Sequence, residues 1–471
     1  LEPNRWEELV ARSVWLHLSK LSSSGCVLGE AAAMRLAEIS TVYPHWQLSS
    51  NERDEFSHWM SGTGDPDFKN SHEVDIAPRK RQELVQWLQK QVSEPKFFYE
   101  DTWKDVCRRH LLNSLFALND LADMDEWPIK RWQEAFQVWS DTGIVKRSWC
   151  FVAPIVLKMP DKILLELGHS VTWWIESASK LINLKEDIML SLCRRVLALP
   201  LEAFFGSLTN EDGGKNFDPV TSAINHPVGH VTQSLINLWF KQNPNDNELL
   251  SDVLKPIFTL ICDVQESKFR HGRVILGSRL IAFFRVDSTW TEQHLLPLFN
   301  WDNPVEAKAV WAGFLYSPRL YQPLLIAFKP HFLESVKHYS DLGESQQQFS
   351  AFLTYVALGL GEGYSVDEFR TAFAALPQEG LQESAQSLFQ ALEGAAEQRE
   401  DYWKNRVEPL WQQVWPKSRD LASSKIAESL SRLAIAARGE FPAALAAVKD
   451  WLQAIEDPYF IVHLLNESGL C

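Results

Sequence analysis

The segment from residue 289 to 332 most constrains the fold, because it encodes short apolar helices in succession without a strand pattern. It reads TWTEQHLLPLFNWDNPVEAKAVWAGFLYSPRLYQPLLIAFKPHF. Thr289 and Glu292 have the spacing of a capping box, which predicts the start of a first helix. Asn303 as N-cap, with Pro304 at the first helical position, predicts the start of a second.

The helix that follows Asn303 mixes small residues with large aromatic rings. Such a helix can approach its neighbours closely and is apolar on more than one face. We therefore expect it to be buried among other helices, at the centre of a packed array. A third helix follows the Ser317-Pro318 turn, and Pro330 predicts the start of a further one.

The length of the chain allows several domains or one continuous array of helices. It has 471 residues, of which 45% are hydrophobic, and its 20 tryptophans and 26 phenylalanines are spread along the whole sequence. Large rigid rings at such intervals predict core anchors in many separate helix pairs, and some could be exposed anchors for a partner.

The pattern along the chain predicts an all-α fold. Helix pairs joined by short turns with Pro or Asn recur at intervals of about 40 residues, as in helical-repeat (HEAT-like) arrays of short antiparallel helix pairs. The polar, glycine-containing segment 206–219 lacks hydrophobic periodicity and is the best candidate boundary. We therefore predict an N-terminal helical domain at 1–205 and a C-terminal helical-repeat domain at 219–471.

Charge and cysteine usage restrict the partners and the compartment. A formal net charge of −15 argues against nucleic-acid binding, which needs a basic surface. The six cysteines form no CxxC pair, so we expect reduced thiols in a cytoplasmic protein. No apolar run reaches the length of a membrane span. The chain begins with Leu1 and ends at Cys471, and we expect it to be a piece of a longer protein.

Standard catalytic signatures are missing from the sequence. It contains no HExxH, GxSxG or P-loop motif. Gly359, Gly361 and Gly363 form a loose GxGxG, but no strand precedes it, so a turn that ends a helix is the better interpretation.

Two histidines have the spacing of metal ligands. His226 and His230 lie four residues apart, and on one helix face this spacing can hold a metal ion with a third ligand from elsewhere. The alternative is that His226, which precedes Pro227, marks the start of a helix. The second interpretation is the simpler one.

A basic cluster, KFRHGR, contains Lys268, Arg270, His271 and Arg273. One interpretation is a contact for an acidic partner or for a phosphate-bearing ligand. The other, which we favour, is a solvated loop between two helices.

Three stretches carry a resemblance to a known group of proteins. They are NHPVGHVTQSLINLWF (225–240), FNWDNPVEAKAVWAGFLYSPRLYQPLLIAFKPHFL (299–333) and QREDYWKNRVEPLWQQVWPKSRDLAS (398–423). They resemble the helical region that lies C-terminal to a sirtuin-like domain in bacterial anti-phage proteins, the defence-associated sirtuins. The resemblance covers most of residues 220–471.

The resemblance implies a regulatory role. In that family the sirtuin-like domain hydrolyses NAD once a phage component is sensed, and the infected cell aborts. The helical region is the part that senses and regulates. Nothing in this sequence resembles the sirtuin domain itself, so no catalytic residue is carried over and no cofactor is expected.

These observations lead to three hypotheses of different classes. The first is a non-catalytic sensor that recognises a phage structural protein, or contacts its own sirtuin-like domain, and thereby controls NAD hydrolysis outside this chain. The second is a general helical scaffold or homo-oligomerisation module without a foreign ligand. The third is an unrecognised helical enzyme that uses His226, His230 or the cluster around His271.

Overall fold

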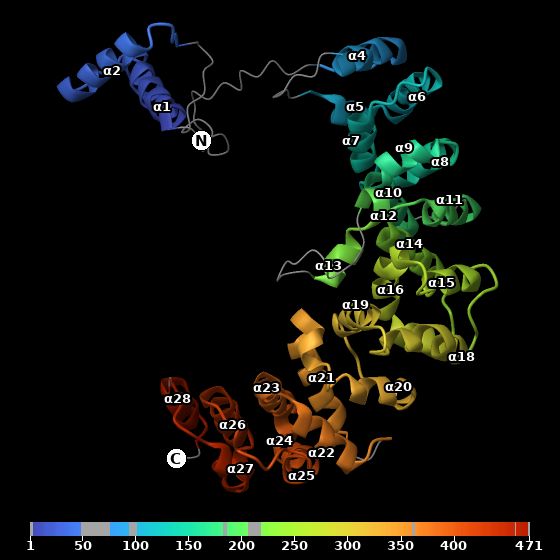
Figure 1. Ribbon diagram of the computed structural model, residues 1–471, viewed down its shortest axis with the longest axis vertical. Coiled ribbons are helices and arrows are strands. Elements are labelled where there is room, and N and C mark those ends of the chain that lie inside the picture. The colour runs from blue at the N-terminus through green and yellow to red at the C-terminus, as the bar shows by residue number, and fades with distance from the viewer. Residues whose placement is uncertain are drawn as a thin grey trace. The chain divides into compact units, whose positions relative to one another are not determined.

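The computed structural model describes residues 3–48, 76–93, 101–181, 186–205, 218–359, 363–456 and 458–469. The chain divides into two compact units: residues 1–77 with 90–103 form unit 1, and residues 78–89 with 104–471 form unit 2. All described helices of both units are drawn in Figure 1. The GxGxG motif falls partly, and the expected boundary at 206–219 falls mostly, outside the described residues.

Unit 1 is built on a helical hairpin of α1 (Pro3–Ser23) and α2 (Glu30–Val42). Trp15, Leu16 and Ile39 form its buried core. The Trp15 indole donates a hydrogen bond to the Ser40 hydroxyl at 3.2 Å and packs edge-on against Trp46. A single tryptophan thus joins the two helices by apolar and polar contacts together.

Helices α4 (Arg81–Ser93) and α5 (Trp103–Arg109) each have residues in both units. The α-helices of the first half of unit 2 are α6 (Leu111–Asp123), α7 (Ile129–Trp139), α8 (Val145–Val156), α9 (Asp161–Glu166), α10 (Gly168–Leu181), α11 (Glu186–Ala198), α12 (Glu202–Phe205), α13 (Pro219–Ile224), α14 (Pro227–Lys241), α15 (Lys255–Ile261) and α16 (Arg270–Gly277). Those of the second half are α17 (Leu280–Val286), α18 (Ser288–Trp290), α19 (Pro304–Leu315), α20 (Gln322–Glu334), α21 (Gln346–Ala357), α22 (Val366–Ala375), α23 (Gln378–Gly394), α24 (Arg399–Tyr402), α25 (Glu408–Gln413), α26 (Ser424–Ala436), α27 (Phe441–Val448) and α28 (Tyr459–Glu467).

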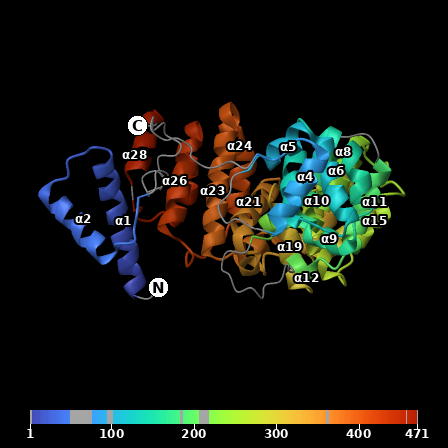
Figure 2. The same ribbon diagram turned by 90° about the horizontal axis from the view of Figure 1, so that it is seen from above.

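Unit 2 is an array in which the main packing partner of a helix lies two to four α-helices further along the chain. The helix α10 packs on α14, α14 on α16 and α16 on α19; further on, α21 packs on α23, α23 on α26 and α26 on α28. Figure 2 shows α21, α23 and α26 side by side. Every described element is helical, so the prediction of an all-α array is confirmed.

Several tertiary hydrogen bonds join residues that lie 33 to 43 positions apart, while others span 58 to 65 positions. Arg81 bonds to Asp120, 39 residues later, Arg273 to Glu306, 33 later, and Arg370 to the carbonyl of Gln413, 43 later. The shorter separations are those expected where one helix pair contacts the next pair of an array.

The array continues across the boundary expected between 1–205 and 219–471. Helix α10 precedes that boundary and α14 follows it, and the two pack directly against each other within unit 2. A polar, glycine-containing stretch can be a connection between packed helices. Polar composition alone does not distinguish such a connection from a link between domains.

The central segment contains one confirmed and two wrong predictions of helix starts. Asn303 caps α19, and its side chain accepts a hydrogen bond from the backbone N–H of Glu306 at 3.4 Å. The Thr289 box is wrong, because Asp287 caps the preceding turn by accepting from the N–H of Trp290 at 3.0 Å. Pro330 does not start a helix but lies inside α20, where Phe328 and Phe332 on either side are both buried.

Helix α19 is buried, as expected, and crosses α16 at very close range. A Cβ atom added to Gly313 of α19 would lie 2.1 Å from the carbonyl oxygen of Val274 in α16. A Cβ on Gly277 of α16 would lie 2.9 Å from the carbonyl oxygen of Val310 in α19. The two glycines therefore set the distance between these helices.

Most described tryptophans are core anchors, as the sequence indicates. The fully buried ones include Trp132, Trp149, Trp239, Trp311 and Trp403. Among the described residues, no helix combines the length and the apolar character needed to cross a membrane.

Candidate functional site

The basic cluster predicted from KFRHGR is the start of helix α16, and it is buried. Arg270, His271 and Arg273 all belong to this helix and are shielded from solvent. Lys268 precedes it, pairs with Glu266 at 3.6 Å and lies over the Phe269 ring. The interpretation as a solvated loop is therefore wrong.

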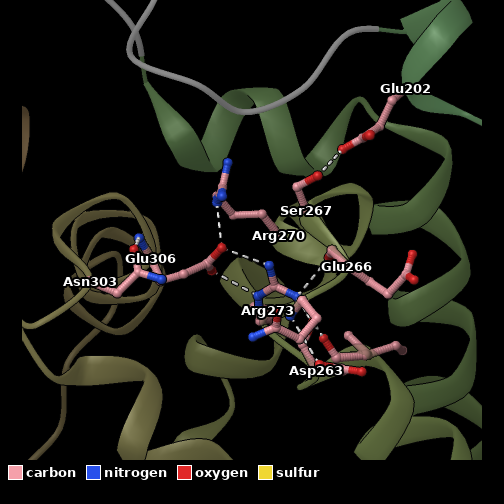
Figure 3. Close-up of polar contacts among 10 residues, drawn as sticks. Glu202, Asp263, Glu266, Ser267, Arg270, Arg273, Asn303 and Glu306 are labelled. Carbon is pink, nitrogen blue, oxygen red and sulfur yellow. Dashed lines mark hydrogen bonds and ion pairs between the residues drawn. The ribbon is translucent and has the colours of Figure 1, made fainter.

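A single carboxylate pairs with both arginines. Glu306, at the first turn of α19, accepts from Arg270 Nε at 2.7 Å and from Arg273 Nε and Nη2 at 2.8 and 2.7 Å. Figure 3 shows the carboxylate between the two guanidinium groups. The side chains of Arg273 and Glu306 are 0% and 1% exposed, so the pair is removed from water.

Backbone carbonyls complete the coordination of Arg273. Its Nη1 donates to the carbonyl oxygens of Ile261, Asp263 and Glu266 at 3.1, 2.8 and 3.2 Å. These carbonyls belong to the end of α15 and the turn that follows it, where carbonyl oxygens no longer have an N–H partner within the helix. Arg273 thus joins α15, α16 and α19, which is an architectural role. Its guanidinium group is already paired inside the chain.

His226 and His271 form a parallel stack between α14 and α16. Their ring centroids are 3.7 Å apart and their planes differ by 2°. His226 caps α14, because its Nδ1 accepts from the N–H of Val228 at 3.1 Å, so the prediction of a helix start there is confirmed. Burial lowers the pKa of His226 to about 4 and that of His271 further, so both rings are neutral at pH 7.

His230 lies one turn further along α14 and faces a different helix. Its Nδ1 is 3.0 Å from the Thr172 hydroxyl of α10, and burial lowers its pKa to about 4. His226 and His230 therefore have different hydrogen-bond partners, although their spacing matches that of metal ligands. The described residues contain no group of three or more side chains placed to hold a metal ion.

The buried His230 is linked to the surface through two residues of α10. His169 and Trp173 pack edge-on against its ring, with centroid distances of 5.3 and 5.5 Å. Both also line an open groove of about 750 Å³ between α7 and α10, and Trp173 is 48% exposed. We call this the α7–α10 groove.

Hydrogen-bonding side chains dominate the rest of the α7–α10 groove. They are Lys130, Gln133, Glu134, Gln137, Ser140, Asp141, Thr142, Ser170 and Ser177. Sequence reasoning missed this groove, although one signal was present. Trp173 and Trp174 are consecutive in a helix and point about 100° apart, so only one of them can face the core squarely.

Comparison with known proteins gives one distant relative. An uncharacterized protein of Sinorhizobium fredii, y4cA, is 20% identical over 477 residues. The match covers 97% of this chain but 38% of the relative, so the chain spans less than half of that protein's length. No known protein family and no solved structure matches the chain.

Proposed function

We propose that this chain is a non-catalytic sensor and regulatory region of a bacterial anti-phage protein. It binds a phage structural protein in the cytoplasm and controls NAD hydrolysis by a sirtuin-like domain outside the chain. The observation that carries the proposal is the α7–α10 groove, in which a half-exposed indole lies among amide and hydroxyl groups on a rigid helical array.

The composition of the groove suits a polypeptide. Tryptophan is strongly enriched among the residues that dominate binding energy at protein interfaces, because it offers a large rigid surface and one N–H donor. The amides of Gln133 and Gln137 and the hydroxyls of Ser170 and Ser177 can pair with backbone groups of a bound segment. The ring of Trp173 is held in place by its contact with His230.

The length of the relative supports a role within a larger protein. In the Sinorhizobium protein, most of the sequence lies outside the matching region. A region that senses and a region that acts can be separate parts of such a protein. The identity of the acting part as a sirtuin-like domain rests on the resemblance of residues 225–240, 299–333 and 398–423.

The decisive experiment has two stages. First, the tagged chain is used to capture proteins from phage-infected cells, and a captured phage protein is purified. That protein is then added to the full-length parent protein while NAD consumption is followed. The proposal expects NAD to be consumed only when the phage protein is present. Binding without any effect on NAD, or no specific binding at all, would contradict it.

A scaffold or homo-oligomerisation module is the alternative. Light scattering of the purified chain distinguishes the two functions. A stable oligomer that captures no phage protein supports the scaffold, whereas a monomer that binds a phage protein supports the sensor.

A further inference from the structure

A second pocket lies near the C-terminal end of unit 2, far along the array from the α7–α10 groove. It has a volume of about 710 Å³ and is lined by residues of α23, α24, α26 and α28 and of the turns beside them. Its walls combine apolar and charged side chains: Phe389, Glu393, Arg399, Arg432, Ile435, Ala436, Arg438, Phe460, Leu464, Glu467 and Ser468. We call it the arginine pocket.

Aromatic rings hold one of its three arginines. The guanidinium of Arg432 lies 5.3 Å from the ring centre of Phe389 and 4.6 Å from that of Phe460. Phe460 is nevertheless 42% exposed, so part of its ring remains open to a ligand. Cation–π contacts fix the position of the charge and leave its N–H groups available.

The arginines retain hydrogen-bonding capacity. The Nε atoms of Arg399 and Arg432 are buried and have no hydrogen-bond partner among the described residues. No ion pair of Arg399 is found in the described part of the chain, while Arg432 is 3.9 Å from Glu428. Arg438 pairs with Glu397 at 3.2 Å, but that glutamate is 90% exposed. Because exposed pairs are weak, an incoming anion can replace Glu397 at small cost.

From these features we propose that the arginine pocket binds a nucleotide. Arg399 and Arg438 can donate forked hydrogen bonds to phosphate oxygens, which is the geometry that guanidinium groups favour. The exposed part of the Phe460 ring offers a stacking surface for the base. Glu393 and Glu467 supply acceptors for ribose hydroxyls, a role that a pure anion site would not need.

The size of the pocket agrees with this ligand class. Small-molecule sites in proteins have volumes of roughly 300–1,000 Å³, and this pocket falls within that range. The chain as a whole is negative, but the lining of this pocket has three arginines and two glutamates, a formal charge of +1. The inference is independent of whether a phage protein binds the α7–α10 groove.

Calorimetric titration of the full 471-residue chain with ADP tests the proposal. Inorganic phosphate and adenosine, titrated separately, report the contributions of the two halves of the ligand. We expect ADP to bind at least tenfold more tightly than either. The variants Arg399→Gln and Arg438→Gln should each weaken ADP binding about tenfold or more, because each removes a charged donor.

The control is Arg370→Gln, which alters an exposed arginine of α22 that pairs with Asp367. It should leave ADP binding unchanged, and the helical circular dichroism of all three variants should match that of the parent chain. Equal affinity for phosphate and ADP would overturn the nucleotide assignment in favour of a simple anion site. Absence of ADP binding, or binding that survives both pocket substitutions, would overturn the site itself.

Discussion

Arg273 and Glu306 are joined by two parallel hydrogen bonds, 2.8 and 2.7 Å long, in a part of the array that water does not reach. The two residues lie on α16 and α19, 33 positions apart in the chain. Burying an ion pair is costly, and the cost is offset only where geometry is good and every remaining donor is satisfied. Here Arg270 donates to the same carboxylate, and three backbone carbonyls accept hydrogen bonds from Nη1 of Arg273.

Removal of the shared carboxylate should therefore destabilise the array strongly. Glu306→Gln leaves two buried guanidinium groups without a counter-charge, and we expect a loss of ~3–5 kcal/mol in the free energy of unfolding. Chemical denaturation followed by circular dichroism measures this loss. The matched control is Glu334→Gln, which breaks an exposed pair with Lys337 and should cost at most about 1 kcal/mol. Similar losses for both variants would contradict the structural role of Glu306.

The crossing of α16 and α19 should not tolerate a methyl group. Gly313→Ala would bring Cβ to 2.1 Å from the Val274 carbonyl oxygen, so the helices must separate. Overpacking of this kind costs ~1–3 kcal/mol, or more where backbone must move. Gly394→Ala at the end of α23 is the control, since a Cβ there meets no atom within 4 Å. It should be neutral or stabilise by up to about 1 kcal/mol. Thermal unfolding should show a lower midpoint for Gly313→Ala and an unchanged or higher midpoint for Gly394→Ala.

Local signals in the sequence predicted some helix starts correctly. Asn303 caps α19 and His226 caps α14, as expected. Each of these features depends on residues within four positions of one another. The wrong prediction of a capping box at Thr289 also rested on residues close in sequence. Asp287, two residues earlier, provides the cap instead.

The burial of the basic cluster could not be predicted in the same way. The partner of Arg270 and Arg273 lies 36 and 33 residues later, so its identity depends on which helices pack together. A signal existed in Glu306, an acidic residue in an otherwise largely apolar helix. A buried charge of this kind needs a partner on a neighbouring helix. The repeat period then restricts the search for that partner to about 40 residues on either side.

The buried histidines should make stability depend on pH. Burial lowers the pKa of His226 and His230 from the ordinary 6.5 to about 4. Between these values the unfolded chain binds more protons than the folded one, so the free energy of unfolding falls as the pH drops from 6.5 to 4. For each of these histidines, the shift in pKa corresponds to a loss on the order of 3 kcal/mol in the free energy of unfolding once the pH is below 4.

The variant His226→Asn isolates one part of this pH dependence. Asparagine is a good N-cap, so α14 keeps its cap while the titrating ring is removed. We expect the stability of this variant to fall less steeply than that of the parent chain between pH 6.5 and 4. The control is His463→Asn, which removes a half-exposed ring of α28. Equal slopes for the parent chain and His226→Asn would show that His226 does not contribute.

The last prediction concerns the α7–α10 groove. If the groove binds the phage protein, Trp173→Ala should weaken that binding at least tenfold, since a central indole commonly contributes 2 kcal/mol or more. The ring is half-exposed, so its removal should alter the free energy of unfolding much less than Glu306→Gln does. Tyr316→Ala removes a ring that is 71% exposed and does not line this groove, and it serves as the control. Surface plasmon resonance with the captured phage protein compares the three chains. Binding that depends on Tyr316 rather than Trp173 would move the interface away from the groove, and equal binding by all three would exclude both positions.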